Sequence, residues 1–544
     1  MIGITQPRRL AALGLSQRVS IELNSDITGY HIRYDNNITK DTKLKIMTDG
    51  ILLKEIQEDF LLTKYSVIIL DEIHERNVNM DILIPLLKKI IKIRFENNDK
   101  LTLILMSASK IDQDIINYFE KIKIIDVSSN SHKVSIFYED RILNDLLIAT
   151  YQRIKKIMKI KSTCENNTIL VFLPSKIDIF KLQNILLDDL SINDLCVVLP
   201  LYSSLSKDEQ NLIYKDFEKR KIILSTNISE TSITIPDVYY VIDLGLVKNK
   251  ILKDGVVEYS IDYISQSSAQ QRAGRAGRTG PGICYRLYTG QIYNSMDESN
   301  VPKIFYEPLE NILIDLINLG INNLHKFPYI NKPSDEKIDQ SLKKLIKLNI
   351  LSKTKELTQI GKCLSCLPLS PNIGKLLCVP NTKNITPELI DLACIMSVNI
   401  ELKKNEFTKK YYIDEKSDLI VILKIFRDFL KNRKKFKLHK NISSFEEVVK
   451  MSNFIRKKFN LDYRNELSFE IKNQLRFVLF NTFKDQISVL YDGFYYYRNK
   501  EVKLSNNSVD IDGECVIFEY LLKGTKNIYM KNITVLDREW FNTK

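Results

Sequence analysis

Short apolar runs that each end in a polar motif constrain the fold of this chain more than any other feature. Three of them read SVIIL, LTLILM and KIIL, and the motifs that follow are DEIH (71–74), SAS (107–109) and STNISETS (225–232). Continuous apolar runs separated by helical patterns are typical of parallel strands that are buried on both faces. Because such sheets bind ligands at the carboxyl ends of their strands, we expect chemistry at these three motifs.

The strand pattern is repeated in two blocks and then gives way to other patterns. Runs at 168–174 and 238–244 resemble the first ones, and the blocks divide near residues 126–135, which predicts an α/β fold in two parts. Beyond about residue 300, apolar residues recur at helical spacing, in residues 335–350, 384–400 and 417–430. The last 70 or so residues return to short β-type runs with turn signals at Asp492-Gly493 and Asp512-Gly513, which predicts a small barrel.

Composition narrows the class of protein. A chain of 544 residues is too long for one hydrophobic core, so several domains are expected. The hydrophobic fraction of 44% and the charged fraction of 27% are ordinary for a soluble globular protein. No run is long and apolar enough to span a bilayer, and no signal peptide is recognised, so no membrane partner is expected.

The cysteines favour reduced thiols over a metal site. Cys363 and Cys366 form the only C-x-x-C among eight cysteines. No second pair and no histidine cluster completes a zinc site around them. We therefore expect the buried, reduced thiols of an intracellular protein, and no bound zinc.

The formal net charge of +13 is unevenly distributed along the chain. Residues 401–440 hold 13 lysines and arginines against 6 acidic residues, a local net charge of +7. A basic chain of this kind favours a polyanionic partner, most simply nucleic acid. The alternative is a mutational bias toward AT-rich codons, because lysine, isoleucine and asparagine are abundant throughout.

Two adjacent acids, Asp71 and Glu72, follow the strand predicted at 66–70. Phosphoryl transfer to water needs one carboxylate that holds Mg²⁺ and a second group that orients the attacking water. A lone Asp-Glu pair is weak evidence, since such pairs are common on surfaces. Two acids directly after four apolar residues are costly to bury without a function, so VIILDEIHER favours a site for phosphate chemistry.

Arginines recur every three residues in QQRAGRAGR (270–278), at Arg272, Arg275 and Arg278. This spacing predicts three guanidinium groups on about one helical face, with glycines that let a ligand approach closely. Arginines placed in this way stabilise the charge on a transferring phosphoryl group. An RNA-backbone patch or a solvated helix face are the alternatives.

Together these motifs resemble the DEAH-box RNA helicases of helicase superfamily two, and the resemblance covers essentially the whole chain. ITQPRRLAALGLSQRVS (4–20) resembles motif Ia, and KLKIMTDGILLKE (43–55) resembles motif Ib. DEIHER is similar to motif II with Ile73 in place of the usual alanine, and SAS to motif III with Ser109 in place of threonine. ILVFLPS resembles motif IV, STNISETSITIPDV resembles motif V, and QQRAGRAGRTGPG resembles motif VI. LTQIGKCLSCLPLSPNIGKLL (357–377) resembles the start of the ratchet domain.

The resemblance implies an α/β protein with two RecA-like parallel-sheet domains, of which the first is incomplete at its N-terminus. Winged-helix, helical-bundle and OB-fold β-barrel domains would follow, the last marked by TKNIYMKNITVLDREW. The expected boundaries are 1–126 and 127–297 for the RecA-like domains, 298–360 for the winged helix, 361–470 for the helical ratchet domain and 471–544 for the OB-fold.

The resemblance further implies an enzyme, an ATP-dependent RNA helicase with ATP and Mg²⁺ as cofactors. Asp71 would hold Mg²⁺ directly, and Glu72 would reach the metal through the water that it positions or activates. His74 would couple the site to the second domain, and Ser107 and Ser109 would link hydrolysis to movement. The residues implied to close on the γ-phosphate are Gln271, Arg275 and Arg278.

The resemblance also assigns the rest of the nucleotide site and a path for single-stranded RNA. Leu246 replaces the usual phenylalanine opposite Arg18, so base stacking is expected to be weaker. The other implied nucleotide contacts are Asp237 and Ser232. RNA-backbone contacts, which fix position without reading sequence, are implied for Arg8, Arg9, Thr48, Asp49, Thr226 and Asn227.

Two further segments have alternative interpretations. Residues 248–262 predict a hairpin around Asp254-Gly255, which in the family would protrude and separate strands or guard the RNA exit. A plain solvent-exposed hairpin is the alternative. The aromatic cluster from Phe494 to Tyr497 would either stack bases on the barrel surface or form a core strand.

One motif of the family, the phosphate-binding loop G-x-x-x-x-G-K-[ST], does not occur in the chain, and its expected place is shortly before Thr5. Either the loop belongs to a longer polypeptide, and the protein is a helicase or RNP-remodelling ATPase, or the loop is lost and the protein is a non-catalytic RNA-binding scaffold. Without the loop's backbone amides and lysine, the 544 residues alone are predicted to show little or no ATPase activity.

The family suggests a cellular setting. Its members serve pre-mRNA splicing, ribosome assembly and other RNA processing, mostly in the nucleus, and glycine-rich activator peptides often drive them. The resemblance therefore implies mRNA splicing first and ribosome biogenesis second, within a ribonucleoprotein complex and with such an activator as a partner. The expected location is intracellular, in the nucleus, with the nucleolus and the cytoplasm as alternatives.

Overall fold

The computed structural model describes most of the chain and divides it into two compact units. The described residues are 1–119, 121–127, 132–160, 168–203, 205, 207–231, 235–253, 255–378, 383–400, 404–436, 441–461, 464–510 and 513–541. One unit comprises Met1–Asn249, Ser260–Phe305 and Pro328–Lys332. The other comprises Lys250–Tyr259, Tyr306–Phe327 and Pro333–Lys544. The five domain boundaries expected from the sequence therefore remain predictions.

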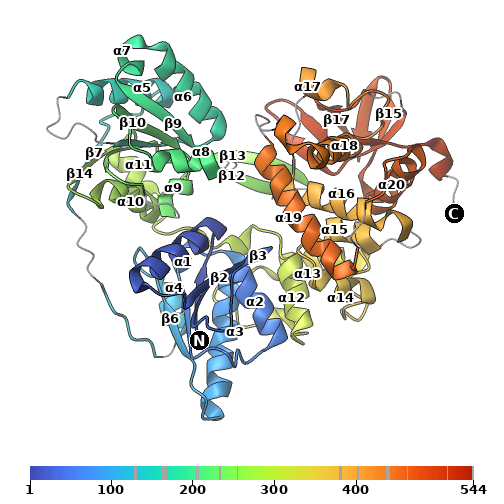
Figure 1. The fold of residues 1–544 in the computed structure, drawn as a ribbon, viewed down its shortest axis with the longest axis horizontal. Helices are drawn as coiled ribbons and strands as arrows, with labels where there is room; N and C mark the ends of the chain where they lie inside the picture. Colours follow the sequence, from blue (N-terminus) through green and yellow to red (C-terminus); the bar gives the residue numbers. More distant parts are fainter. Residues whose placement is uncertain are drawn as a thin grey trace. The chain divides into compact units, whose positions relative to one another are not determined.

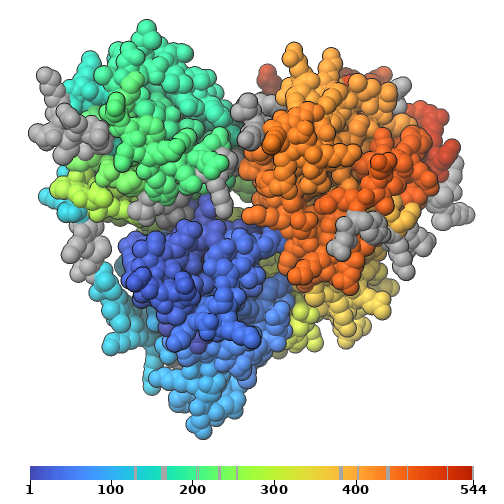
Figure 2. All heavy atoms as spheres, in the orientation of Figure 1, coloured from blue at the N-terminus to red at the C-terminus, as the bar shows by residue number. Residues whose placement is uncertain are grey.

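The first unit begins with a six-stranded sheet whose strand order is β3-β2-β4-β1-β5-β6. Its strands are β1 (Ile2–Gln6), β2 (Thr28–Ile32), β3 (Asp35–Asn36), β4 (Leu44–Thr48), β5 (Val67–Leu70) and β6 (Thr102–Leu105). All neighbours are parallel except β2 and β3. The helices of this region are α1 (Arg9–Leu23), α2 (Asp49–Glu58), α3 (Val78–Glu96) and α4 (Gln113–Tyr118), and together they form one packed body, blue in Figure 2.

Strand β6 differs from the expectation that its apolar run would be buried on both faces. It lies at the edge of the sheet and pairs with β5 alone among the described strands. Ile104 is 42% exposed and Met106, just beyond the strand, is 37% exposed. An edge strand has a neighbour on one side only, so part of its apolar surface stays open although its sequence reads as a central strand.

A second six-stranded sheet in the same unit follows the order β7-β14-β11-β8-β10-β9, with every neighbour parallel. Its strands are β7 (Val134–Tyr138), β8 (Thr168–Phe172), β9 (Cys196–Leu201), β10 (Arg220–Ser225), β11 (Val238–Asp243) and β14 (Gly282–Arg286). Ile169 and Val171 of β8 enter one apolar cluster, and Leu170 and Phe172 enter another. Here the prediction of a strand buried on both faces is confirmed.

Helices surround the second sheet, and the parallel α/β architecture of both sheets is that of RecA-like helicase domains. The longer helices are α5 (Leu146–Met158), α6 (Lys176–Asp188) and α10 (Gln266–Gly274), and the short ones are α7 (Leu190–Asn193), α8 (Lys207–Asn211), α9 (Ile228–Thr231) and α11 (Gly290–Ser295). Figure 1 shows these helices around the sheet. The prediction of an α/β fold with two parallel sheets is therefore confirmed.

The second unit is mainly helical at first, as the spacing of apolar residues predicts. Its helices are α12 (Glu310–Asn318), α13 (Asp335–Lys347), α14 (Gln359–Ser365), α15 (Pro371–Gly374), α16 (Thr386–Val398), α17 (Glu406–Lys409), α18 (Asp418–Lys431), α19 (Ile442–Phe459) and α20 (Phe469–Thr482). Helix α16 packs against α18 and α19, and ten consecutive residues from Pro387 to Met396 are buried. No helix among the described residues is long and apolar enough to cross a membrane.

Short strands close the chain, and they join the predicted hairpin in one nine-stranded sheet of order β12-β13-β19-β20-β17-β16-β15-β18-β21. The C-terminal strands are β15 (Ile487–Tyr491), β16 (Phe494–Tyr497), β17 (Lys500–Leu504), β18 (Cys515–Ile517), β19 (Tyr520–Lys523), β20 (Ile528–Lys531) and β21 (Thr534–Val535). The hairpin strands are β12 (Leu246–Lys253) and β13 (Val256–Tyr263). Of the three predicted turns, two have their aspartate, Asp254 or Asp512, outside the described residues. The small barrel remains a prediction.

The pairing and burial in this sheet bear on two questions that the sequence left open, the setting of the hairpin and the role of the aromatic cluster. Val256 and Val257 of β13 pair in parallel with Leu521 and Leu522 of β19, so this end of the hairpin is not surrounded by solvent alone. In β16, Tyr495 is buried, whereas Phe494 and Tyr496 are 49% and 37% exposed. The aromatic cluster thus contributes both to the core and to the surface, and base stacking remains a prediction.

Candidate active site

Asp71 lies directly after β5, where the sequence predicted chemistry. Gln6 Nε2 donates a hydrogen bond to Asp71 Oδ2 at 2.6 Å, and the Glu72 backbone N–H donates one to Oδ1 at 2.8 Å. Burial raises the pKa of Asp71, while these two hydrogen bonds act in the opposite direction. The side chain is therefore fixed by the end of the neighbouring strand β1, and sequence reasoning did not identify Gln6 in this role.

Glu72 has a left-handed backbone conformation and a raised pKa. Its φ of 56° lies in the left-handed region, which costs a residue with a side chain about 1 kcal/mol and often marks a functional site. Burial, then the charges of Asp71 and Glu75, raise its pKa to about 7. A carboxyl group with a pKa near neutrality is suited to accept a proton from an attacking water.

His74 links the end of β5 to the SAS motif after β6. Its Nδ1 lies 3.3 Å from Ser107 Oγ, and its Nε2 lies 3.3 Å from Glu72 Oε2. Burial lowers the pKa of His74, so the ring is neutral at physiological pH and its approach to Glu72 is not an ion pair. Ser107 Oγ also donates a hydrogen bond to the Ser109 carbonyl at 2.8 Å.

A buried network ties the residues that follow His74 to the rest of the first sheet. Arg76 is 1% exposed, and it donates hydrogen bonds to Asp81 and Asp112 and to the side chain of Asn331. Asn77 accepts the Met80 backbone N–H at 2.9 Å and so caps helix α3. These contacts join residues as far apart in sequence as 76 and 331, and no local pattern in the sequence indicated them.

Asp49, expected to contact RNA, is turned inward instead. It is 3% exposed, and Asn77 Nδ2 donates a hydrogen bond to its Oδ2 at 2.8 Å. Burial raises its pKa to about 6. In this structure Asp49 fastens the start of α2 to the residues that follow DEIH, and an RNA contact at this position stays a prediction.

The three arginines of QQRAGRAGR do not share one role or one helical face. Helix α10 ends at Gly274, and Arg275–Gly277 continue as a tighter 3₁₀ turn. Arg272 is 1% exposed and donates to Glu230 Oε2 at 3.1 Å and to Asp243 Oδ1 at 2.8 Å. It is a core residue that joins helix α9 to the end of strand β11, because a buried guanidinium needs carboxylate partners.

Arg275 and Arg278 are the members of this group that interact electrostatically with Glu72 of the first sheet. Arg275 is buried, and its Nε donates to the Glu230 carbonyl oxygen at 3.0 Å. Burial lowers the pKa of both arginines, and the negative charge of Glu72 acts against that shift in each case. Reciprocally, the charges of Arg275 and Arg8 counteract the raised pKa of Glu72. The structure thus brings these arginines within electrostatic reach of Glu72.

Three buried polar atoms of the predicted catalytic residues form no hydrogen bond within the described part of the chain. They are Glu72 Oε2, His74 Nε2 and Gln271 Nε2. Buried polar atoms are nearly always paired, so the open acceptor of Glu72 fits a hydrated cation and the open donor of Gln271 fits a phosphate group. The donor set therefore fits Mg²⁺ and ATP, which prefer oxygen ligands and cationic donors, respectively.

The remaining predicted residues are dispersed over both sheets. Arg18 is an exposed residue of α1 and pairs with Glu22 at 2.8 Å. The Leu246 carbonyl oxygen accepts from Arg272 at 3.3 Å, and Asp237 has a left-handed backbone with a φ of 58°. Ser232 lies outside the described residues.

Among the residues expected to contact RNA, Arg8 and Arg9 already have partners within the first sheet. Arg8 lies 3.3 Å from Glu75, and the Arg9 guanidinium lies 5.8 Å from the centre of the Tyr34 ring. Thr48 occupies the N-cap position of α2. The two residues expected from the second sheet are Thr226, which is half-buried, and Asn227, which is exposed.

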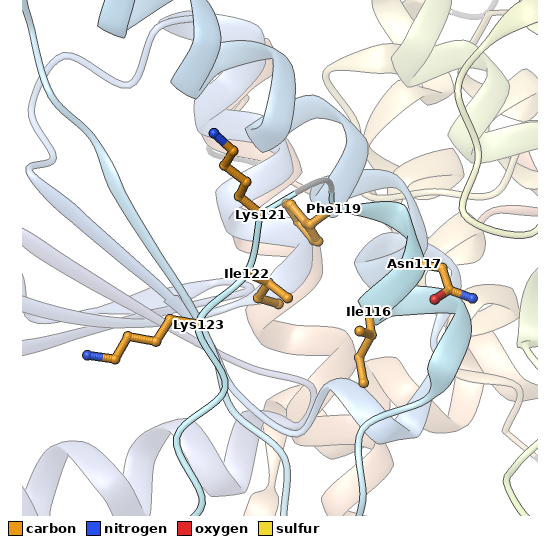
Figure 3. Close-up of a pocket in the computed structure, with 6 residues that line it drawn as sticks. All are labelled: Ile116, Asn117, Phe119, Lys121, Ile122 and Lys123. Atoms are coloured by element: carbon orange, nitrogen blue, oxygen red, sulfur yellow. The ribbon is translucent and has the colours of Figure 1, made fainter.

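A cavity of about 850 Å³ lies elsewhere in the first unit, at the end of α4. Figure 3 shows its six lining residues, Ile116, Asn117, Phe119, Lys121, Ile122 and Lys123. None of the residues expected to act on ATP or RNA lines it. In the part of the chain that the structure describes, no group of three or more histidine, cysteine, aspartate or glutamate side chains is arranged to hold a metal ion.

Two parallel α/β sheets, with paired carboxylates at a strand end of the first and buried arginines beside the second, define a protein of the RecA-like helicase class. Comparison with known proteins agrees: residues 149–280 match the family "Helicase conserved C-terminal domain". The chain is 32% identical to the ATP-dependent RNA helicase DHX33 of Mus musculus, over 99% of this chain and 82% of that protein. The chain belongs to the DEAH-box family of ATP-dependent RNA helicases.

Two yeast relatives show how coverage varies within the family. The putative pre-mRNA-splicing factor ATP-dependent RNA helicase C20H4.09 of Schizosaccharomyces pombe is 31% identical over the whole of this chain and 88% of its own length. The putative ATP-dependent RNA helicase PB1A10.06c of the same organism is 34% identical, but the match covers 73% of this chain and 39% of that protein. The chain therefore spans well under half of some relatives and most of others.

Proposed function

We propose that this protein is an ATP-dependent RNA helicase that couples ATP hydrolysis to movement along single-stranded RNA. The observation that carries the proposal is the electrostatic interaction of Arg275 and Arg278, which follow helix α10 beside the second sheet, with Glu72 at the end of a strand in the first. Groups from two sheets that meet around one phosphate provide a way to turn hydrolysis into relative motion of the sheets.

Each residue would contribute one part of the reaction. Mg²⁺, when bound, neutralises charge on the phosphate oxygens; Asp71 would hold it directly and Glu72 through a water. Glu72 would orient that water and accept its proton, while Arg275 and Arg278 would stabilise the charge on the transferring phosphoryl group. Gln271 would donate a hydrogen bond to the same group through its open Nε2.

His74, Ser107 and Ser109 would transmit the state of the site to the rest of the first sheet. The neutral ring of His74 lies within 3.3 Å of both Glu72 and Ser107, so a shift of the carboxylate would be felt at the SAS motif. Arg18, Asp237, Leu246 and Ser232 would contact the nucleoside. These contacts rest on the family pattern alone.

A phosphate-binding loop would complete the site, and the open edge of β6 supports a place for it. Ile104 and Met106 leave apolar surface exposed beside a strand that has one neighbour in the described residues. We propose that a further strand, with a phosphate loop at its end, covers this edge in the active protein. Loss of the loop, and with it a non-catalytic RNA-binding scaffold, is the competing function.

RNA binding would involve both sheets and the second unit. Arg8, Arg9, Thr48, Thr226 and Asn227 would contact the RNA backbone, since basic and hydroxyl groups bind phosphates without reading sequence. The second unit would supply a winged helix at 298–360, a helical ratchet domain at 361–470 and an OB-fold at 471–544. The hairpin β12–β13 would guard or divide the RNA path.

The cellular process would be RNA processing in the nucleus, within a ribonucleoprotein complex. Relatives include proteins named pre-mRNA-splicing factors, such as prp22 of Schizosaccharomyces pombe, which is 36% identical over 80% of this chain and 38% of its own length. Splicing is therefore the first expectation and ribosome assembly the second. A glycine-rich activator protein would bind the second unit.

The decisive experiment purifies the natural polypeptide through a C-terminal tag at its own genomic locus, so that any residues ahead of Met1 are retained. RNA-stimulated ATP hydrolysis and duplex unwinding are then measured for the wild type, for Glu72→Gln and for the exposed control Glu96→Gln. A helicase is supported if Glu72→Gln lowers ATP turnover at least about 100-fold while Glu96→Gln does not. RNA binding without hydrolysis in the wild type would instead establish the scaffold.

The mass of the tagged protein distinguishes the two explanations of the absent loop. The 544 residues alone have a mass of 63.3 kDa. A larger, active polypeptide would support a strand and loop contributed from outside these residues. An active protein of 63.3 kDa would contradict the prediction that ATP turnover requires that loop.

A further inference from the structure

The turn between β1 and α1 contacts two of the acidic residues that follow β5. Gln6 Nε2 donates a hydrogen bond to Asp71 Oδ2 at 2.6 Å, and Arg8 Nη2 lies 3.3 Å from Glu75 Oε1. Glu72, the residue assigned to the attacking water, lies between these two acids in the sequence. The β1–α1 turn therefore holds the acidic segment at a position before Glu72 and at a position after it.

Both contacts are largely shielded from water. Gln6 is 5% exposed, and the side chains of Arg8 and Glu75 are 31% and 12% exposed. A polar contact is stronger where the effective dielectric constant is low, so these two restrain their partners more than surface contacts would. The second carboxylate oxygen of Asp71 accepts the Glu72 backbone N–H, so the positions of the two reacting acids are linked.

A short helix joins Glu75 to Glu72. The 3₁₀ helix η1 (Ile73–Glu75) follows Glu72, and the Glu75 backbone N–H donates a hydrogen bond to the Glu72 carbonyl oxygen at 3.0 Å. Glu72 itself has a left-handed backbone, which persists only where surrounding contacts hold it. A contact that fixes the Glu75 side chain therefore helps to fix Glu72.

The β1–α1 turn also presents positive charge where two helices begin. Arg8 and Arg9 are partly exposed at the start of the 15-residue helix α1. On the neighbouring parallel strand β4, Thr48 is the register partner of Gln6 and the N-cap residue of α2. In the described structure, neither Arg8 nor Thr48 caps its helix with its side chain. Helix N-termini and arginines both attract phosphate, which supports the RNA-backbone contacts proposed for this turn.

We propose that the β1–α1 turn transmits RNA binding to the ATP site. A phosphate held by Arg8 restrains its partner Glu75, and a turn fixed in this way keeps Gln6 on Asp71. This coupling rests on the function proposed above, which assigns an RNA contact to Arg8 and hydrolysis to Asp71 and Glu72. The planar fork of an arginine binds a carboxylate with some of its N–H groups and a phosphate with others. Gln6 and Glu75 are thus positioning residues, because they act on hydrolysis through neighbouring acids.

The first test measures ATP turnover of the natural polypeptide, tagged at its C-terminus, with and without saturating oligouridylate. Glu75→Gln keeps the size of the side chain but removes the charge that Arg8 binds. Its ratio of RNA-stimulated to basal turnover is expected to fall about tenfold, the effect of one lost charge-assisted hydrogen bond. Its affinity for oligouridylate is expected to stay within about twofold or to increase, because an acid beside Arg8 is removed. The exposed control Glu96→Gln leaves both quantities unchanged.

A double-mutant cycle separates this route from a general loss of structure. Arg8→Gln and Glu75→Gln are each expected to lower the stimulation ratio. The double variant is expected to lose no more than about twofold beyond the larger single loss, since both changes remove one contact. Fully additive losses would overturn the coupling. If Glu75→Gln does not fold, Arg8→Gln at its partly exposed position carries the test, and an unchanged ratio there would overturn the coupling.

Gln6→Ala tests the other contact of the turn. It removes the amide that holds Asp71, so the Mg²⁺ concentration for half-maximal ATP turnover is expected to rise about fivefold. The matched control Gln113→Ala, at an exposed glutamine, is expected to leave this concentration unchanged. Equal Mg²⁺ requirements in the two variants would show that the turn does not position Asp71.

Hydrogen exchange distinguishes a failure of this coupling from a failure of the proposed function. Oligouridylate is expected to slow amide exchange at residues 72–76 several-fold in the wild type and less in Glu75→Gln. If the wild type binds RNA but hydrolyses no ATP, the helicase proposal fails and this exchange still decides the coupling. No protection in the wild type, or equal protection in both proteins, would overturn the coupling. A wild type that binds no oligouridylate would overturn both.

Discussion

The strands β8 and β6 have similar apolar sequences but occupy opposite environments. All five residues of β8 are buried in the middle of the second sheet, with separate apolar clusters on its two faces. Strand β6 lies at the edge of the first sheet, and Ile104 is 42% exposed. An apolar run therefore identifies a strand without fixing its place in the sheet, because place depends on which strands pair beside it.

The carboxylates at the strand ends of the two sheets also differ in how completely they are hydrogen-bonded. In the first sheet, the carboxylate of Glu72 keeps one acceptor without a hydrogen bond among the described residues, and Glu72 adopts a strained backbone. In the second, the buried carboxylate of Asp243 is fully engaged by Arg272, Tyr288 and the Gly245 backbone. The first arrangement is suited to bind a ligand, whereas the second stabilises the fold.

The largest expected effect concerns Arg272. Its replacement in Arg272→Met leaves Glu230 and the fully buried Asp243 without their cationic partner, which is expected to destabilise the protein by about 3–5 kcal/mol. Urea denaturation measures the change. The matched control is Arg278→Met, at a residue that is exposed by surface area although its guanidinium is partly desolvated. It is expected to alter stability by less than about 0.5 kcal/mol while lowering RNA-stimulated ATP turnover. Equal losses of stability would remove the distinction between structural and reactive arginines.

The second prediction tests the two strands directly. Leu170→Ala, at the centre of β8, is expected to lower the free energy of unfolding by about 2–5 kcal/mol, because it leaves a cavity in a fully buried cluster. Ile104→Ala, on β6, is expected to cost less than about 1 kcal/mol. Urea denaturation of both variants checks the difference. A comparable cost at Ile104 in the purified natural polypeptide would instead indicate that β6 is covered there.

The third prediction concerns pH. The folded protein raises the pKa of Glu72 from 4.5 to about 7, so the folded state binds this proton more tightly than the unfolded state. Stability contributed by the protonated form is present below pH 4.5 and is lost as the pH rises to about 7. Glu72→Gln removes this loss, and it is expected to be more stable than the wild type by about 1–3 kcal/mol at pH 8.

Thermal unfolding of the ligand-free wild type and of Glu72→Gln at pH 4.5 and pH 8 measures this effect. The difference in stability between the two proteins is expected to be much smaller at pH 4.5 than at pH 8. The exposed control Glu96→Gln has no such pH-dependent gain. A Glu72→Gln variant that is less stable than the wild type at pH 8 would show that Glu72 is well paired and not strained.

The smallest expected effect separates the two serines of the SAS motif. The Ser107 hydroxyl contacts His74 and donates to the Ser109 carbonyl, whereas Ser109 contributes backbone atoms to these hydrogen bonds. Ser107→Ala is therefore expected to lower unwinding per ATP hydrolysed by about fivefold, the equivalent of one hydrogen bond of about 1 kcal/mol. Ser109→Ala is expected to have a smaller effect. The reverse order in a duplex-unwinding assay would contradict the proposed link through His74.

Much of the architecture could be predicted from the sequence, because local patterns determine secondary structure and strand ends. The parallel α/β arrangement, the helices near 335–350 and 417–430 and the C-terminal strands follow from the spacing of apolar residues. The place of Asp71 and Glu72 at the end of β5 could be predicted as well. The secondary structure and the strand ends both depend on neighbours within one element or one turn.

Long-range pairing could not be predicted in this way. Gln6 reaches Asp71 across 65 positions in the sequence, and Arg76 reaches Asn331 across 255. The inward orientation of Asp49 depends on Asn77, and the structural role of Arg272 depends on Asp243, so neither could be read from a motif. A motif identifies which residue types are present, and the packing of separate elements decides which of them stay open to a ligand.

The side of β6 that pairs with no described strand also has a consequence for how the protein behaves at high concentration. An edge strand presents unpaired backbone N–H and C=O groups, and these can pair with an edge strand of another molecule. The charged or proline residues that usually prevent such pairing do not occur in its sequence, TLIL. The isolated 544 residues should therefore self-associate as their concentration rises, and a charge at Ile104, as in Ile104→Lys, should keep them monomeric.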